Sequence, residues 1–155
     1  MLEWYEVAGR LAAAAALGGA IGFEREAVGH DAGFRTHMLL ALGAALFGAI
    51  SVGAFDTYTD RRAATNVNID ITRIASYVAA GVGFIGGGAI LKSFGAVRGI
   101  TTATSLWTAA AVGLAAGLGF WAGAVVTTVV ALIALAALKP IDTLIDRYSS
   151  KPYIV

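Results

Sequence analysis

Five stretches of the sequence, each 17–19 residues long, contain almost no charged residues: 7–23, 38–55, 74–91, 100–118 and 120–138. A helix rises 1.5 Å per residue, so about 20 apolar residues cross the roughly 30 Å hydrocarbon core of a bilayer. The stretches are apolar on all faces, which is typical of helices surrounded by lipid or protein. We therefore predict an all-α, polytopic membrane protein with five transmembrane helices at these positions.

The composition agrees with a membrane location. Hydrophobic residues make up 58% of the 155 residues and charged residues 14%, whereas soluble domains average about 45–50% and about 25%. The sequence has no cysteine, which excludes disulfides and thiolate chemistry. A net charge of +1 without a basic patch predicts no nucleic-acid partner.

The spans divide the chain into a transmembrane domain, residues 1–139, and a short cytoplasmic interfacial tail, residues 140–155. A single helix over residues 100–138 would be about 58 Å long, too long for a bilayer. Gly117 and Gly119, followed by two aromatic residues, therefore predict a turn between the last two spans. In the tail, apolar residues recur at helical spacing after Pro140, which predicts a short amphipathic helix on the membrane surface.

Lysine and arginine predict the orientation. With five spans, seven of these residues fall on the side of the C-terminus and four on the other side. Because positive residues gather on the cytoplasmic side, we expect a cytoplasmic C-terminus and an N-terminus outside.

Polar residues gather at the predicted cytoplasmic ends of helices that are far apart in the sequence. Seven of the fourteen residues from Glu24 to His37 can ionise. One interpretation is solvated loop charge with a local Glu–Arg pair. The other is a polar cluster that joins the first, second and fourth helices, with Glu24 and Arg35 at its centre. The candidate residues are Glu24, Arg25, Glu26, Arg35, Thr36, His37, Thr101, Thr102, Ser105 and Trp107.

Hydroxyl side chains are dense at the start of the fourth span. Thr101, Ser105 and Thr108 share one helix face, and Thr101 or Thr102 is placed to cap the helix N-terminus. The alternative is that these hydroxyls bond back to carbonyls one turn earlier, as is common in membrane helices. Trp107, beside them, is interpreted as a packing residue.

A second polar set lies at the predicted outer side. Asp70 and Arg73 form a candidate pair there, and Arg10 lies about one turn inside the first helix. Arg10 either extends outward to the interface or pairs with Asp70, and we favour the first.

Four GxxxG pairs predict close helix packing. They are Gly18 with Gly22, Gly83 with Gly87, Gly113 with Gly117, and Gly119 with Gly123. The alternative for the third span is that the consecutive glycines 86–88 loosen the helix and expose carbonyls to an ion or substrate.

Three motifs carry a resemblance to a known family: IGFEREAVGHDAGFRTHMLLALGAALF, DITRIASYVAAGVGFIGGGAIL and GITTATSLWTAAAVGLAAGLG. They occur in order and at the family's spacing, and the chain resembles the membrane domain of MgtC/SapB-type proteins. The resemblance implies a multi-pass protein of the bacterial inner membrane with five helices and an outside N-terminus. The matched polar positions are Glu24, Arg25, Glu26, Arg35, Thr36, His37, Asp70, Arg73, Thr101, Thr102 and Trp107.

The resemblance carries further expectations. His30 stands where family members usually have Lys or Arg. Many members also have a cytoplasmic C-terminal domain of the small α+β regulatory type, and we expect this sequence to hold the transmembrane domain without it. Members are linked to growth under magnesium limitation and to virulence through survival inside host cells. Some are reported to act on the F-type ATP synthase.

Two functions of different classes fit these features. The first is a regulatory or accessory membrane protein that contacts a partner such as the F-type ATP synthase, or a second copy of itself in a homodimer. The alternative is a transporter or channel for Mg²⁺, protons or a small solute. No nucleophile–base pair is readable, so we expect neither enzyme activity nor a cofactor. Mg²⁺ prefers several hard oxygen ligands, and two carboxylates flanked by Arg25 and Arg35 do not predict a metal site.

Overall fold

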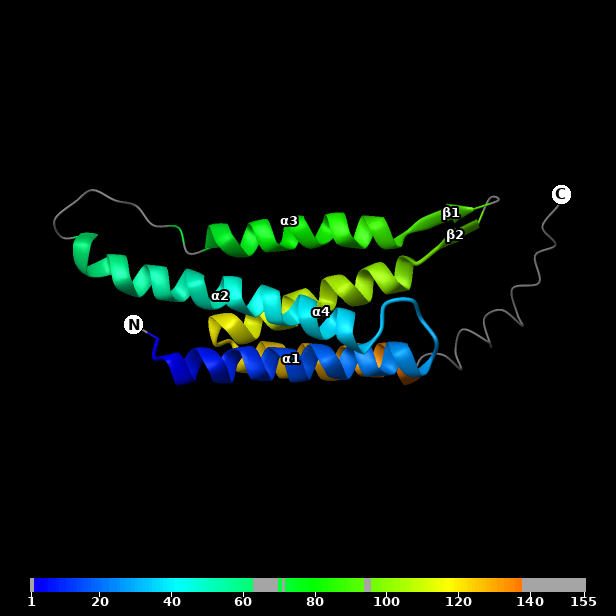
Figure 1. Cartoon of the computed structure of the whole chain (residues 1–155), viewed down its shortest axis with the longest axis horizontal. Helices are drawn as coiled ribbons and strands as arrows, with labels where there is room; N and C mark the ends of the chain where they lie inside the picture. The colour runs from blue at the N-terminus through cyan, green and yellow to red at the C-terminus, as the bar shows by residue number, and fades with distance from the viewer. Residues whose placement is uncertain (1, 63–69, 71, 94–95, 138–155) are drawn as a thin grey trace.

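The computed structural model describes residues 2–62, 70, 72–93 and 96–137, and the predicted amphipathic helix after Pro140 lies outside them. The described residues form five helices and one two-stranded hairpin (Figure 1). All-α architecture is therefore confirmed, with the hairpin as a small addition. The elements are α1 (Trp4–Ala27), α2 (Phe34–Arg62), α3 (Thr72–Ala89), β1 (Leu91–Ser93), β2 (Ala96–Arg98), α4 (Ile100–Leu118), α5 (Trp121–Leu132) and a π-helical turn η1 (Ile133–Ala137).

Helix ends depart from the predicted spans where charge or glycine intervenes. The helix α2 continues to Arg62, seven residues beyond the apolar stretch. Charged side chains do not interrupt the backbone hydrogen bonds of a helix, so the helix can extend past its apolar part. The helix α3 ends at Ala89, directly after three glycines that weaken helical structure. The predicted span extends to Leu91, but Leu91 instead begins an antiparallel hairpin, in which it pairs with Arg98.

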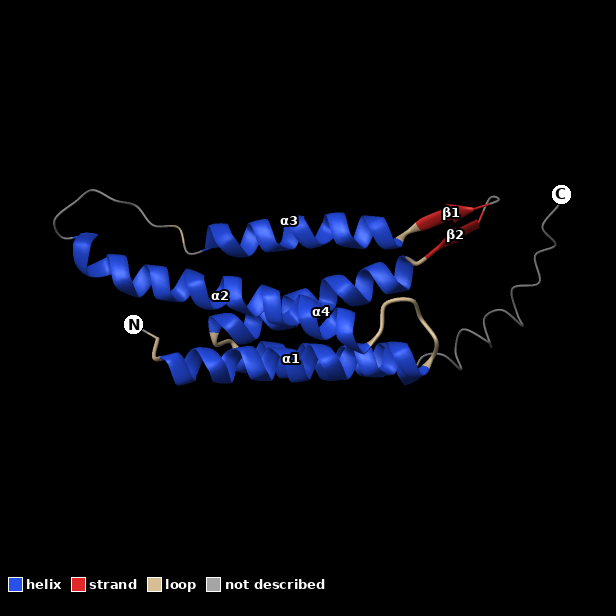
Figure 2. Ribbon diagram, in the orientation of Figure 1, coloured by secondary structure: helices blue, strands red, loops and turns tan. Residues whose placement is uncertain are grey.

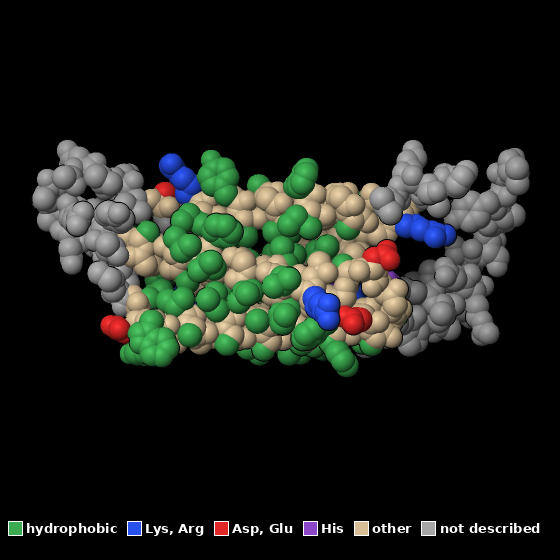
Figure 3. All heavy atoms as spheres, viewed as in Figure 1, with side chains coloured by type: hydrophobic (Ala, Val, Ile, Leu, Met, Phe, Trp, Pro, Cys, Tyr) green, Lys and Arg blue, Asp and Glu red, His purple; other side chains and the backbone are tan. Residues whose placement is uncertain are grey.

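Within the described residues, three helical segments are long and apolar enough to cross a bilayer, and they correspond to three of the five predicted spans: Trp4–Ala27, Phe34–Phe55 and Ile100–Leu118. The segment Trp121–Ala136 is apolar but shorter. The helices lie side by side along one direction, and the hairpin extends from the end where α3 leads into α4 (Figure 2). Hydrophobic side chains cover the middle of the visible face along this bundle (Figure 3).

The centre of the bundle is α4, which contacts α1, α2, α3 and α5. Glycine makes this possible, because a Cβ at Gly113 or Gly117 would overlap the backbone of Ala41 or Ala45 in α2. On α1, a Cβ at Gly18 would overlap the Ala41 side chain. The packing predicted for these glycines is confirmed.

The other predicted GxxxG pairs behave differently. Gly119 ends α4 in a left-handed conformation, φ 84°, which confirms the predicted turn before α5. A Cβ at Gly123 would meet only the ring of Phe120, one turn earlier. Gly83 and Gly87 on α3 face open space among the described residues, so no described helix packs at this pair.

Candidate functional site

The buried centre of the polar cluster is His37, on the first turn of α2. Its side chain is 0% exposed. The ring Nδ1 lies 2.9 Å from the Gly33 carbonyl oxygen, and Nε2 lies 3.0 Å from the Ser105 hydroxyl oxygen on α4. Gly22 of α1 provides the space, because a Cβ there would come within 2.8 Å of the His37 Cβ. Three helices therefore meet at one imidazole.

The hydrogen bonds around His37 admit two proton arrangements. The Gly33 carbonyl only accepts, so Nδ1 carries a hydrogen. The Ser105 hydroxyl, which lies 2.9 Å from the Thr102 carbonyl, has a single proton. With a neutral ring, that proton is donated to Nε2. With an imidazolium, Nε2 donates to Ser105, which donates in turn to Thr102. In both arrangements the imidazole and the Ser105 hydroxyl are hydrogen-bonded to each other, so the contact joins α2 and α4 in either case.

A buried ion pair lies on α1 beside this histidine. The Arg25 side chain is 2% exposed, and its Nε and terminal nitrogen pair with the Glu24 carboxylate. The guanidinium also donates to the carbonyl oxygen of Leu135 in η1, at 3.3 Å. Burying a charge is costly unless it is paired and hydrogen-bonded, as it is here. Arg25 thus connects the end of α1 to the end of the last helix.

Glu26 has a local role. Its carboxylate accepts a hydrogen bond from the Phe34 backbone N–H, at 2.8 Å. This N–H is among those at a helix start that have no partner within the helix. Gly33 is needed beside it, since a Cβ there would come within 2.6 Å of the carboxylate. Glu26 therefore closes the loop between α1 and α2.

Several candidate residues lie apart from this buried centre. Arg35, predicted as the partner of Glu24, is exposed, as are Thr36, Thr101 and Trp107. The hydroxyl residues predicted to share one face of the fourth span differ in exposure. Thr101 is exposed, whereas Ser105 is buried, as is the neighbouring Thr102. Neither Thr101 nor Thr102 caps α4, whose N-cap is Gly99. The hydroxyls of Thr104 and Thr108 donate to carbonyls three and four residues earlier, as the alternative interpretation states. The Ser105 hydroxyl lies near the carbonyl of Thr102 and also contacts His37.

The predicted outer pair is present and exposed. Arg73 Nε lies 4.0 Å from Asp70 Oδ2, and the two side chains are 72% and 50% exposed. Asp70 also accepts hydrogen bonds from the Thr72 hydroxyl and N–H, at 2.6 and 2.9 Å. The hydroxyl bond is the main cause that lowers the pKa of Asp70 below its ordinary value.

Arg10 has a partner that sequence reasoning missed. It neither extends outward alone nor pairs with Asp70; it donates to the Gly117 carbonyl oxygen, at 2.7 Å. The last carbonyls of a helix lack partners within the helix, and a cation is favourable there. Two sequence features could have predicted this contact. They are an arginine inside an apolar span and a neighbouring helix that ends at a glycine, whose last carbonyls need a donor.

The described residues do not fit a resident magnesium site. They contain no group of three or more His, Asp or Glu residues placed to hold a metal ion. The two carboxylates of the cluster are engaged, Glu24 with Arg25 and Glu26 with the Phe34 N–H. In the same part of the chain, no buried side-chain nitrogen or oxygen lacks a hydrogen-bond partner.

Known proteins resemble most of the chain. The family described as "MgtC family" matches residues 11–144. A protein of Escherichia coli strain K12 named "Putative magnesium transporter YhiD" is 41% identical over 81% of this chain and 57% of its own length. "Protein MgtC" of Brucella abortus is 38% identical over 88% of this chain and 52% of its own length.

A Synechocystis protein without an assigned function is 40% identical over 94% of this chain and 58% of its own length. The chain thus spans little more than half the length of these curated relatives. No solved structure matches it.

Proposed function

The chain belongs to the MgtC family, and from this premise we propose that it is a regulatory membrane protein that acts by helix contacts with a partner or with a second copy. It resides in the bacterial inner membrane, crosses it five times and has its N-terminus outside. Its working context is magnesium limitation and the stress met inside host cells. The candidate partners are its own second copy and an integral membrane complex such as the F-type ATP synthase.

The polar cluster carries this proposal. Arg25 joins Glu24 to the Leu135 carbonyl, and His37 joins the loop before α2 to Ser105 on α4. A transport path would need polar groups such as the Glu24 carboxylate and the Ser105 hydroxyl as ligands for an ion. In the structure these groups are bonded to other parts of the protein. These bonds connect four helical elements instead, which supports a structural role for the cluster and a function carried by the protein surface.

A surface suited to helix contact lies on α3. Ser76, Ala80, Gly83 and Gly87 recur at i, i+4, i+7 and i+11, and all four are exposed. Small residues at this spacing let a second helix approach closely in a membrane. A Cβ at Gly83 or Gly87 meets nothing within 4 Å among the described residues. We call these four residues the small-residue face and assign the homodimer contact to it.

The dimer experiment compares two leucine variants. Gly83→Leu enlarges the small-residue face, whereas Gly9→Leu adds the same volume at a second open position on α1. Each protein is labelled with donor and acceptor fluorophores and reconstituted in liposomes. We expect energy transfer in the wild type and in Gly9→Leu and its loss in Gly83→Leu. Equal transfer in all three proteins would refute the α3 interface.

A transporter is the second candidate, and it is favoured by the name of the Escherichia coli relative, a putative magnesium transporter. The deciding experiment traps a magnesium-sensitive dye inside liposomes that contain the folded protein. Influx is followed with and without a pH gradient, with Glu24→Gln as the comparison. The regulatory proposal expects no flux of Mg²⁺ or protons above empty liposomes. Flux in the wild type that Glu24→Gln abolishes would replace the proposal with transport through the cluster.

A further inference from the structure

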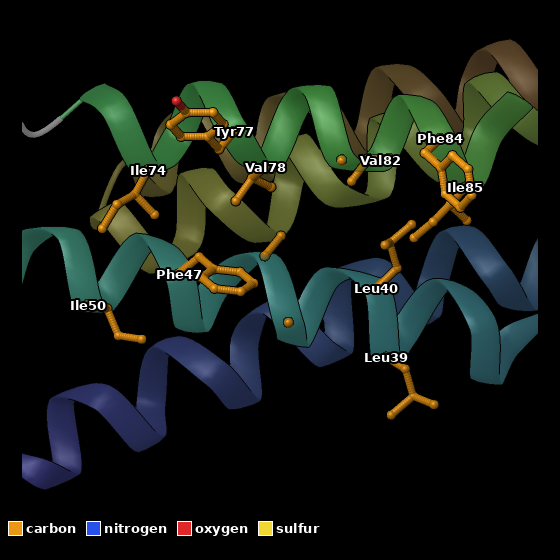
Figure 4. A pocket seen from close by; sticks show the side chains of 13 residues that line it. Leu39, Leu40, Phe47, Ile50, Ile74, Tyr77, Val78, Val82, Phe84 and Ile85 are labelled. Carbon is orange, nitrogen blue, oxygen red and sulfur yellow. The ribbon is translucent and has the colours of Figure 1, made fainter.

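A cavity of about 770 Å³ lies between α2 and α3, away from the polar cluster. Figure 4 shows Phe47 on α2 and Ile74, Val78 and Val82 on α3 around it. Every residue of its described lining is apolar or glycine apart from Tyr77. The volume falls within the roughly 300–1,000 Å³ that is usual for small-molecule sites. Such a space in a membrane protein is filled by lipid or by protein.

The length of this groove matches one fatty acyl chain. On α3 it extends from Ile74 to Ile85, about 16 Å at 1.5 Å per residue. One leaflet contributes about half of the roughly 30 Å hydrocarbon core, or about 15 Å. The first lining residue on α3, Ile74, lies two residues after the helix start at Thr72, so the groove reaches the end of the bundle where α3 starts.

The side chains of the groove fit a thin chain better than a helix. Phe47, Phe84 and Ile85 are 51%, 87% and 47% exposed along it. Closely packed membrane helices meet at small residues, and a helix with its side chains is about 10 Å across. Bulky side chains along both walls hold such a helix away, whereas an acyl chain passes between them.

Two residues of opposite charge, Arg73 and Asp70, lie at the end of the groove near the start of α3. Arg73 directly precedes Ile74, and Asp70 lies one turn before it. The two side chains form an ion pair at 4.0 Å and are 72% and 50% exposed, so a ligand can reach both. A zwitterionic headgroup has two charged groups that match this pair. Its phosphate can bind Arg73, and its ammonium can bind Asp70. Tyr77, 72% exposed one turn further on, is a residue type that favours the headgroup level.

We propose that the α2–α3 groove binds one zwitterionic phospholipid, with an acyl chain between the helices, its phosphate at Arg73 and its ammonium at Asp70. This inference rests on the proposed function, in which α2 and α3 both cross the membrane. It differs from the dimer proposal in using the opposite side of α3.

The test uses native mass spectrometry of the purified full chain in detergent, titrated with phosphatidylethanolamine or phosphatidylglycerol. Gly81 lines the groove and nothing lies within 4 Å of the position of its Cβ, so Gly81→Leu adds a bulky side chain to the groove. Gly83→Leu is the matched control, because Gly83 lies two residues away and outside the lining. Arg73→Gln tests the headgroup contact, with the exposed Arg98→Gln as its control.

We expect one bound phosphatidylethanolamine per chain, at least roughly tenfold weaker binding in Gly81→Leu, and wild-type binding in Gly83→Leu. Arg73→Gln should weaken binding and Arg98→Gln should not, while phosphatidylglycerol, which lacks the ammonium, should bind less well. Equal binding by Gly81→Leu and the wild type would overturn the lipid site.

The same spectra report the oligomeric state. Lipid binding that depends on Gly81 in a monomeric wild type would overturn the dimer and retain the lipid site. A lipid-free dimer that Gly81→Leu dissociates would place a second copy in the groove and overturn the lipid proposal.

Discussion

His37 and Ser105 lie 68 positions apart in the chain, yet their side chains are 3.0 Å apart in the buried interface between α2 and α4. The contact depends on the small residues around it, because Gly22 of α1 leaves room for the imidazole. Membrane helices gain little from the hydrophobic effect on association, so close packing and such interhelical hydrogen bonds stabilise the bundle.

Ser105→Ala removes the α4 partner of His37 and leaves Nε2 without its hydrogen bond. We expect a loss of about 1–3 kcal/mol in the free energy of unfolding, the usual cost of an unsatisfied buried group. The control is Thr104→Ala, one residue away, whose exposed hydroxyl bonds only within α4. Its effect should stay within about 0.5 kcal/mol. Denaturant unfolding in micelles measures both, and equal losses would contradict the role of His37 and Ser105.

Arg25 and Arg35 form a second matched pair of substitutions. Arg25→Gln leaves the Glu24 carboxylate without the guanidinium and removes the bond to Leu135, so we expect a loss of about 3–5 kcal/mol. Arg35→Gln changes an exposed side chain and should cost less than about 0.5 kcal/mol. The thermal midpoint in detergent is the measurement. A larger effect at Arg35 would restore the pairing predicted from sequence.

Arg25 and Arg35 illustrate what the sequence alone does not determine, namely which arginine side chain points into the bundle. Both flank the loop between the first two helices, and the pattern of residues predicted a cluster with Arg35 beside Glu24, where the structure has Arg25. That choice depends on helix rotation, which places Arg25 inward and Arg35 outward. The bounds of α4 were predicted correctly, because Gly99 and Gly119 mark both ends. The groove beside α3 was not predicted, since it depends on how far α3 lies from α2.

Gly117→Ala should destabilise the bundle, because the added methyl would overlap the backbone of Ala45. Overpacking of this kind costs about 1–3 kcal/mol. Gly9→Ala adds the same methyl in open space on α1 and should stabilise the helix by about 0.5–1 kcal/mol. Opposite signs in a thermal unfolding experiment are expected. A neutral Gly117→Ala would show that α2 and α4 can separate without cost.

Asp70 should titrate below an ordinary carboxyl group, because the Thr72 hydroxyl bonds its charged form. The stabilisation from this lowered pKa is present above the pKa of the unfolded chain and is lost as the pH falls through the folded pKa. Thr72→Val removes the hydroxyl and should raise the pKa of Asp70 toward 3.8, its ordinary value. A carboxyl carbon NMR titration reports the shift. An unchanged pKa would assign the effect to the backbone N–H of residue 72.

The topology is testable because the sequence has no cysteine, so single cysteines report accessibility without background. Five spans with an outside N-terminus place Asp31, in the loop after α1, in the cytoplasm and Phe120, in the turn before α5, outside. In intact spheroplasts, a membrane-impermeant maleimide should label Phe120→Cys and leave Asp31→Cys unlabelled until the membrane is opened. Both residues are exposed in the structure, so burial does not explain a failure to react. Labelling of Asp31→Cys alone would show that the orientation is the opposite of the one proposed. Labelling of both would place the two residues on the same side of the membrane and contradict the five-span topology.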